Sequence, residues 1–180
     1  MENKTLFPGV KDGETFEVAG MEFIKFPEKD GGVPCVAKEI LYNMSFGENN
    51  NFAESKILRR LRKELLPKLE QVVGAENIRT FSTDLTALDG LKDYGSVESK
   101  ISLPTFDFYR ENVEIFDRHN PDRWWWLATP DSTKTHDWDR WVVCVAPSGI
   151  IYGDYFCNFV DFGVRPFCIF ESAIFGSCED

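Results

Sequence analysis

Tryptophan is confined to one short stretch of this chain, and this confinement limits the fold more than any other feature of the sequence. All five tryptophans lie between Trp124 and Trp141. The first three are consecutive and open the final third of the chain, residues 124–170, which ends in a second apolar run. Aromatic rings bring large buried areas. We therefore expect this third to combine a buried frame with a display surface between its two apolar ends.

Length and charge exclude several classes of protein. A chain of 180 residues predicts a single domain, which we place at residues 14–180 behind a flexible polar lead-in, residues 1–13. The formal net charge of −10 argues against a nucleic-acid surface, which needs clustered lysines and arginines, and against binding to anionic lipid. The one basic run, residues 56–63, is interpreted as the solvated face of a helix.

Cysteine usage and hydropathy indicate the compartment. The five cysteines are odd in number and include no C-x-x-C pair, so neither a zinc knuckle nor a redox motif is predicted. No apolar stretch of about 18 residues occurs, so we expect no membrane span. The N-terminus lacks the apolar segment of a signal peptide. We expect synthesis in the cytoplasm and free, mostly buried thiols.

Residue periodicity predicts the elements of the first two thirds. Alternating apolar residues indicate a hairpin of strands 15–18 and 21–26, then a third strand over 33–41. A helix is expected over 52–66 and a polar loop at 43–51. The stripe of that helix that faces the core consists of Ile57, Leu58, Leu61 and Leu65.

Prolines predict where the next helices begin. Pro67 lacks an amide donor, so it should end the first helix and start a short second one that stops near Gly74. Pro104 should start another helix that ends near His119. The apolar positions of this last helix are Phe106, Tyr109, Val113 and Phe116.

Residues 78–91 are expected to form a structured loop rich in aspartate. Asp84, Asp89 and Asp93 could indicate calcium, but the spacing of an EF-hand is absent. Turn and capping roles for these carboxylates are the preferred interpretation.

The frame of the final third is predicted from its apolar runs. Strands are expected over 124–127, 141–146, 150–152 and 163–170, with a turn at 147–149. On a strand, Trp125 would face away from Trp124 and Trp126, and we expect all three to pack in the core. Arg165 lies in a buried strand, so we expect a structural clamp that bonds backbone carbonyls or an aspartate.

The display surface is predicted between these strands, where aromatic residues mix with Asp and Asn. Exposed rings usually mark binding surfaces, and this mixture is typical of antibody loops. Trp138, Tyr155 and Phe159 would serve as apolar anchors, and the charged members would set orientation and charge preference. The alternative is that the rings fold inward and the surface is inert. The full set of candidate ligand-binding residues is Asp137, Trp138, Arg140, Tyr152, Asp154, Tyr155, Phe156, Asn158, Phe159 and Asp161.

Two end motifs carry a family resemblance. Trp125-Trp126-Leu127-Ala128-Thr129-Pro130 and Gly163-Val164-Arg165-Pro166 resemble the W-W-L-x-[ST]-P and G-V-R-P ends of an uncharacterised domain of Firmicutes and their prophages. The stretch 84–95 also looks like one branch of that family, and the resemblance spans about residues 13–175. That family is similar to the C-type-lectin-like fold. The resemblance implies an α+β domain with a mainly antiparallel sheet, two main helices and a ligand-binding surface on the final hairpin region.

The same fold is shared by the variable proteins of diversity-generating retroelements. Every residue from Tyr152 to Val164 can be encoded by a codon that ends in a pyrimidine, and most are reachable from an Asn codon by changing only adenines. Adenine-specific mutagenesis leaves this pattern. We therefore hypothesise a diversified, non-enzymatic binding protein of a phage or gut bacterium, which meets a protein or cell-surface ligand. It would act in a phage particle or at the cell surface, reached by lysis or a carrier.

Two other functions stay open. One is an invariant structural component of a phage particle. The other is a copper-dependent oxidase of the formylglycine-generating type, because Cys144, Cys157 and Cys168 lie in the right third of the chain, although the surrounding motif of that enzyme is missing. His136 and the aspartates beside it match no zinc spacing. The expectation is therefore no enzyme activity, no cofactor and no metal.

Overall fold

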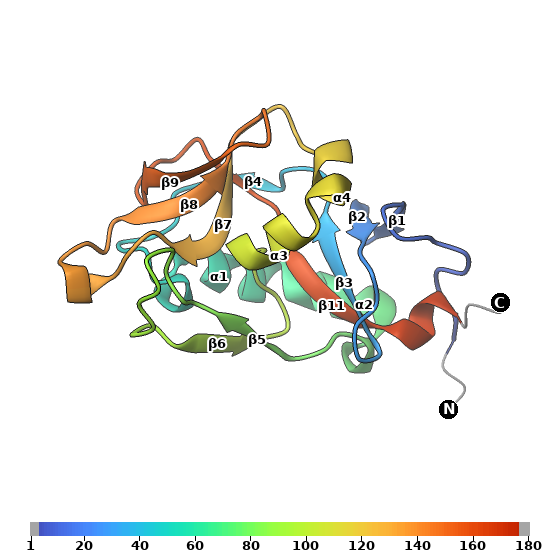
Figure 1. Cartoon of the computed structure of the whole chain (residues 1–180). Coiled ribbons are helices and arrows are strands. Elements are labelled where there is room, and N and C mark those ends of the chain that lie inside the picture. The colour runs from blue at the N-terminus through green and yellow to red at the C-terminus, as the bar shows by residue number, and fades with distance from the viewer. Residues whose placement is uncertain (1–3, 177–180) are drawn as a thin grey trace.

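The protein is described here by a computed structural model that covers residues 4–176. It has an α+β architecture built on two larger sheets, a two-stranded sheet and two helical segments (Figure 1). Seven of the eight pairings between its strands are antiparallel. The prediction of an α+β chain with mainly antiparallel sheets is confirmed.

The first sheet has four antiparallel strands. The predicted hairpin is confirmed, and its two-residue turn holds Ala19 and Gly20 with φ of 52° and 77°, as the twist of a tight hairpin requires. The last strand of the chain returns to pair with the third. The order is β1 (Thr15–Val18), β2 (Met21–Lys25), β3 (Gly32–Ala37) and β11 (Phe167–Glu171).

The second sheet has five strands and carries the tryptophans. The single strand predicted over 163–170 is in fact two, because Arg165 and Pro166 separate a short strand in this sheet from β11 in the other. The predicted loop at 43–51 starts inside a short edge strand. The order is β4 (Tyr42–Asn43), β10 (Gly163–Val164), β7 (Trp125–Pro130), β8 (Trp141–Val145) and β9 (Ile151–Phe156).

A third sheet replaces much of the predicted loop at 78–91. Strands β5 (Phe81–Asp84) and β6 (Ser96–Ser99) pair antiparallel, with Phe81 opposite Ser99. This four-residue strand contains Ser82 and Asp84, which favour turns, and it shows no alternation of apolar and polar residues, so periodicity did not reveal it.

The first helical segment runs without a stop through Pro67. It comprises η1 (Phe52–Glu54), α1 (Lys56–Arg60), the π-helical η2 (Leu61–Leu65) and α2 (Leu66–Val73), with η3 (Ala75–Asn77) after it. The predicted interruption at Pro67 is therefore wrong, but Pro67 does lie in the first turn of α2, which ends at Gly74 as predicted. The wider π-helical turns, in which the Leu66 amide donates to the Leu61 carbonyl, carry the helix past the missing proline donor.

The second helical segment is broken where one helix was predicted. It consists of α3 (Phe106–Glu111) and α4 (Val113–Arg118), and Asn112 between them has φ of −125°. Val113 is exposed rather than part of the core stripe, because the break rotates α4 relative to α3. Tyr109 and Phe116 do point inward as predicted.

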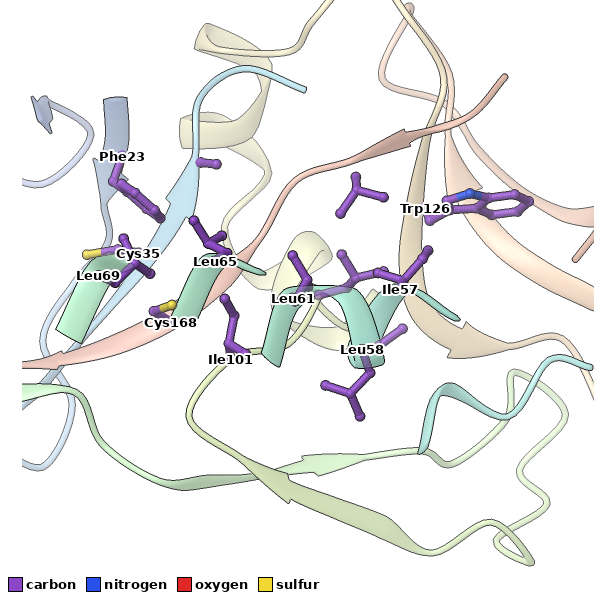
Figure 2. Close-up of a cluster of buried hydrophobic side chains, with 14 of the residues drawn as sticks. Phe23, Cys35, Ile57, Leu58, Leu61, Leu65, Leu69, Ile101, Trp126 and Cys168 are labelled. Carbon is purple, nitrogen blue, oxygen red and sulfur yellow. The ribbon is translucent and has the colours of Figure 1, made fainter. Parts of the chain in front are cut away.

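The two helical segments cover opposite faces of the two larger sheets. One apolar cluster joins Leu61 and Leu69 of the long helix to Phe23 and Trp126 (Figure 2). The other joins Tyr109 and Phe116 to Ile24, Val36 and Trp125. Neighbouring residues of β2 and β7 thus enter different clusters, as the period of two in a strand demands. Within residues 4–176, every helix is too short or too polar to cross a bilayer.

The predicted flexible lead-in, residues 1–13, is packed against the chain's end over its described part. The amides of Leu6 and Phe7 both donate to the Ile174 carbonyl in the 3-10 turn η5 (Ser172–Phe175). The Phe7 ring lies 4.8 Å from that of Phe16 and 5.9 Å from that of Phe175. Residues 1–3 of the lead-in lie outside the described part of the chain.

Candidate functional site

Strand β9 forms one edge of the five-stranded sheet and carries most of the predicted display surface. Its register against β8 shifts: Val142 pairs with Tyr155, but Cys144 pairs with Tyr152. Two residues of β8 therefore span three of β9, which defines a β-bulge. The bulge places Tyr152 and Tyr155 on the same side of the strand, which explains why the sequence showed no clean period there.

Both tyrosines pack on a half-buried tryptophan, Trp124, which itself lies on buried rings. The Trp124 ring lies 5.0 Å from Tyr152 and 4.9 Å from Tyr155, and it stacks on Phe162 at 5.5 Å with an interplanar angle of 11°. Phe162 also contacts Trp126 at 4.7 Å. Trp124 and Trp126 thus lie on one face and Trp125 on the other, as the strand alternation predicted. The display segment is consequently anchored to the core of the sheet.

The outer rings of this segment are open to solvent. Tyr152 is 38 % exposed, Phe156 43 %, Phe159 42 % and Val160 61 %. Ring contacts link Tyr155 to Phe159 at 5.6 Å and Phe159 to Phe156 at 6.5 Å. The alternative in which all rings fold inward does not describe this surface. We name Tyr152, Tyr155, Phe156 and Phe159 the aromatic patch.

A second pair of rings borders the aromatic patch. Trp138 and Trp141 pack edge to face at 4.7 Å, and both approach Phe156, at 6.2 and 6.3 Å. Both indoles are half-buried, and neither Nε1–H has a hydrogen-bond partner within the described residues. An unpaired buried donor is rare and costly in native structures. This corner therefore holds its rings by packing alone.

The loop that carries Trp138 is hydrogen-bonded to the stretch 84–95. It contains the 3-10 turn η4 (Lys134–His136), which ends at Asp137 in the left-handed conformation with φ of 57°. The Thr133 hydroxyl caps this turn and also donates to Asp93 Oδ1 at 2.5 Å. Asp84 accepts from the Thr86 amide and hydroxyl in a local turn. The predicted turn and capping roles of these aspartates are confirmed for Asp84.

Asp89 joins the two loops through Ser132 and His136. Its Oδ2 accepts from the Ser132 hydroxyl at 2.5 Å and lies 2.8 Å from His136 Nδ1. A hydrolytic triad places serine and carboxylate on opposite ring nitrogens of the histidine. Here the same ring nitrogen, His136 Nδ1, lies near both Asp89 and Ser132, whose Oγ is 3.4 Å away. The Ser132 hydroxyl donates to the carboxylate and not to the histidine. The three residues form a structural clasp.

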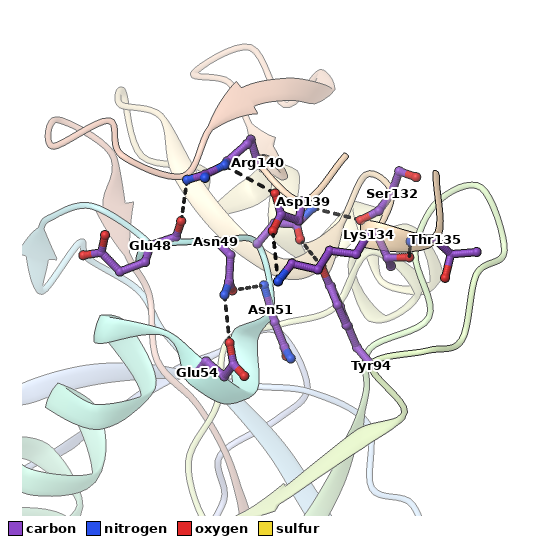
Figure 3. A network of polar contacts seen from close by, with 12 residues as sticks. Glu48, Asn49, Asn51, Glu54, Tyr94, Ser132, Lys134, Thr135, Asp139 and Arg140 are labelled. Carbon is purple, nitrogen blue, oxygen red and sulfur yellow. Dashed lines mark hydrogen bonds and ion pairs between the residues drawn. The ribbon is translucent and has the colours of Figure 1, made fainter. Parts of the chain in front are cut away.

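Asn50 is the central polar residue of the site, and the sequence did not reveal it. Its buried side chain donates to the carbonyls of Ser132 and Trp141, both at 2.9 Å, and accepts from the Tyr94 hydroxyl at 2.6 Å. Figure 3 shows Tyr94 beside Asp139 in this network. Burial, then Asp139 and other carboxylates, raise the pKa of Tyr94 to about 12, so the hydroxyl keeps its proton. No sequence pattern marks an Asn that bridges loops more than 80 residues away.

The polar members of the predicted ligand-binding set lie at the surface, but not all of their side chains are free of contacts. Arg140 donates to the Glu48 carbonyl at 2.7 Å and pairs with Asp139 at 3.3 Å, so its head group is held (Figure 3). Within residues 4–176, the other carboxylates of the set form no ion pair. The exposed members with uncommitted polar groups are Asp137, Asp154, Asn158 and Asp161.

Arg165 bonds backbone carbonyls, as the structural clamp predicted from the sequence would. It is fully buried, and it donates to the carbonyls of Ala37 at 3.0 Å and His119 at 3.3 Å. The guanidinium carbon lies 4.5 Å from the Trp125 ring centre. Burial lowers the pKa of Arg165 to about 10. This side chain ties β3, the end of α4 and β7 together beneath the sheets.

The cysteines within residues 4–176 are all buried, and none of them forms a disulfide. Cys35 and Cys168 face each other across β3 and β11, while Cys144 lies under β9. Burial raises the pKa of each of these thiols, so the thiolate that a soft metal requires is disfavoured. No group of three or more His, Cys, Asp or Glu within residues 4–176 is arranged to hold a metal ion.

Comparisons with protein-family models, with curated proteins and with solved structures found no significant match.

Proposed function

We propose that this protein is a non-enzymatic binding domain that recognises a protein or cell-surface ligand through the aromatic patch. The observation that carries this proposal is the exposure of Tyr152, Phe156 and Phe159 on a segment whose inner rings are fixed in the core. Exposed clusters of apolar residues mark interaction sites on soluble proteins. Rigid rings supply contact area at a low cost in side-chain entropy.

The polar surroundings of the aromatic patch support recognition. Asp154, Asn158 and Asp161 interleave with the rings and are exposed. Short polar side chains provide adaptable hydrogen bonds, whereas binding sites built on strands hold their geometry. The Asn50 network fixes the neighbouring loop without a contribution from the patch itself. The rings are thus presented on a preorganised support, which lowers the entropic cost of binding.

A C-type-lectin-like scaffold with a diversified surface is the more specific form of this proposal. This form is supported by the different burial of two parts of the chain. Trp125, Trp126 and Arg165 are fully buried, whereas the segment with adenine-accessible codons carries the exposed rings. Substitution in such a segment changes the surface and leaves the frame intact.

Peptide selection tests the binding function. Short random peptides from a display library would be selected on the immobilised protein, and their affinities measured for Phe159→Ser and Phe156→Ser. We expect each variant to weaken binding at least about tenfold, or about 1.4 kcal/mol. Val72→Ser is the matched control, since Val72 is similarly exposed on α2, outside the aromatic patch. Equal binding by all four proteins would refute the proposal.

Tyr155 is a poorer probe than Phe159. It is half-buried, and its ring lies 4.9 Å from both Trp124 and Phe162. Removing it therefore costs stability as well as contact area, so Tyr155→Ala should lower the melting temperature.

Sequencing the locus tests diversification. Many cells of one culture would be sequenced across codons 129–162 and their flanks. The proposal expects differences from a nearby near-copy only where that copy has adenine. Fixed codons, with neither a near-copy nor a reverse transcriptase close by, would leave an invariant binding domain.

A further inference from the structure

The charge around the aromatic patch is of one sign. Residues 150–162 contain Asp154 and Asp161 and neither lysine nor arginine. Both aspartates are exposed, and no ion pair to either exists within residues 4–176. Asp154 directly precedes Tyr155 on β9, and Asp161 follows Phe159 by two residues, so both carboxylates belong to the segment that carries the patch. A partner of this surface therefore meets uncompensated negative charge among the rings.

The cationic side chains of the adjoining loop, residues 131–140, are engaged elsewhere. Arg140 is bonded to the Glu48 carbonyl and to Asp139. Lys134 lies 3.9 Å from the same Asp139. Both positive side chains of the adjoining loop are thus directed at Asp139, which leaves the carboxylates of β9 and the following turn unpaired.

From this arrangement we infer that the partner presents a basic protein surface, with arginine or lysine side chains among apolar ones; the inference rests on the proposed binding function. Ring faces attract cations, and arginine can stack on a ring while it bonds a carboxylate. An interface that buried Asp154 or Asp161 against neutral groups would lose their hydration without compensation. Cationic side chains supply that compensation.

Charge also decides between this partner and a second copy of the chain. A two-fold pairing through the aromatic patch would place the same patch on both sides of the interface. Such a pairing would gather two copies of Asp154 and Asp161 in one interface to which residues 150–162 bring no cation, and like charges there disfavour association. The surface is accordingly built for a partner of opposite charge.

The peptide selection described above also tests the inference. We expect selected peptides to be enriched in arginine and lysine next to aromatic or aliphatic residues. Binding should weaken about tenfold in the pair Asp154→Asn and Asp161→Asn, and several-fold when salt rises from about 0.15 to 1 M. Asp107→Asn is the matched control, because Asp107 is an exposed carboxylate on α3.

Two results separate the inference from the proposal on which it rests. If Phe159→Ser abolishes binding, but the peptides are neutral or acidic and the Asn variants bind normally, the basic partner is refuted and the binding function stands. If Phe159→Ser binds as well as the parent, both fail. Self-association of the parent at low salt that is lost in Phe159→Ser would replace the basic partner with a second copy.

Discussion

Tyr152 and Tyr155 lie on the same side of β9 with their ring centres 6.1 Å apart, although an unbulged strand would point them to opposite sides. The bulge between them contains Gly153. A Cβ atom at Gly153 would lie 2.9 Å from Asp131 Oδ1 and 3.1 Å from Leu88 Cδ1. A methyl group at this position of the bulge would therefore have to displace the ends of the Asp131 and Leu88 side chains.

Gly153→Ala should destabilise the protein by about 1–3 kcal/mol, because the added methyl group overpacks this contact. Urea unfolding measures the loss. In an Asp131→Ala background the same substitution should cost clearly less, since the closest contact is gone. An equal cost in both backgrounds would show that the contact with Asp131 is not the cause.

Trp126 and Trp138 should respond differently to replacement by phenylalanine. The Trp126 Nε1–H donates to the Met44 carbonyl at 2.9 Å, and the side chain is fully buried, so Trp126→Phe should cost about 2–4 kcal/mol. The Trp138 Nε1–H has no partner, so Trp138→Phe should cost less than about 1 kcal/mol. Paired urea titrations compare the two. Similar losses would mean that the indole of Trp138 makes a hydrogen bond after all.

Arg165→Met should lower the free energy of unfolding by about 1–3 kcal/mol. The substitution leaves the carbonyls of Ala37 and His119 without their donor in a buried place. Arg110→Met is the control, because the ion pair of Arg110 with Asp107 is exposed and should contribute less than about 1 kcal/mol. A small effect of Arg165→Met would instead make the clamp replaceable by apolar packing.

The Asp89 clasp should make stability depend on pH. Desolvation raises the pKa of Asp89, but hydrogen bonds from Ser132 and His136 outweigh it and hold the pKa below the ordinary value of 3.8. The folded state thus binds this proton more weakly than the unfolded chain. The stabilisation is present above about pH 4 and is lost as pH falls through the lowered pKa. Between about pH 5 and 2, the parent should lose more stability than Asp89→Asn in urea titrations; parallel curves would contradict the clasp.

Thiol labelling tests the burial of the cysteines. In a Cys178→Ser variant, the four remaining thiols should resist an aromatic disulfide reagent while the protein is folded and react after unfolding in urea. The same variant should bind no stoichiometric Cu(I) in the native state. Rapid labelling of the folded protein, or tight copper binding that is lost in Cys144→Ser, would favour the oxidase over the binding domain.

Local signals in the sequence predicted local structure. The hairpin at Ala19-Gly20 and the inward stripe of residues 57–65 follow from neighbouring residues, and both are present. The predicted interruption of the first helix at Pro67 was wrong. A π-helical stretch before the proline, which no periodicity reveals, lets the helix continue through it. Propensity is a weak prior against such tertiary adjustments.

Long-range structure escaped the sequence for a different reason. The parallel pairing of Gly163 with Trp125 and the bridge from Asn50 to Trp141 join residues that are far apart in the chain. At the site, the exposed rings were predicted by their composition. The bulge that sorts them, and the network that supports the loop beside them, depend on contacts that only folding creates.

The return of the chain at Gly163 has a consequence for how this surface can change. The Gly163 amide donates to the Trp124 carbonyl, so the segment that leaves β8 ends in the same sheet, two strands away. The segment from β8 to Gly163 is thus fixed to the five-stranded sheet at both ends. Changing the exposed side chains between these ends leaves the entropy of closing the loop unchanged. A repertoire of chains that differ only at the exposed side chains of this segment would share one backbone frame while each member recognised a different target.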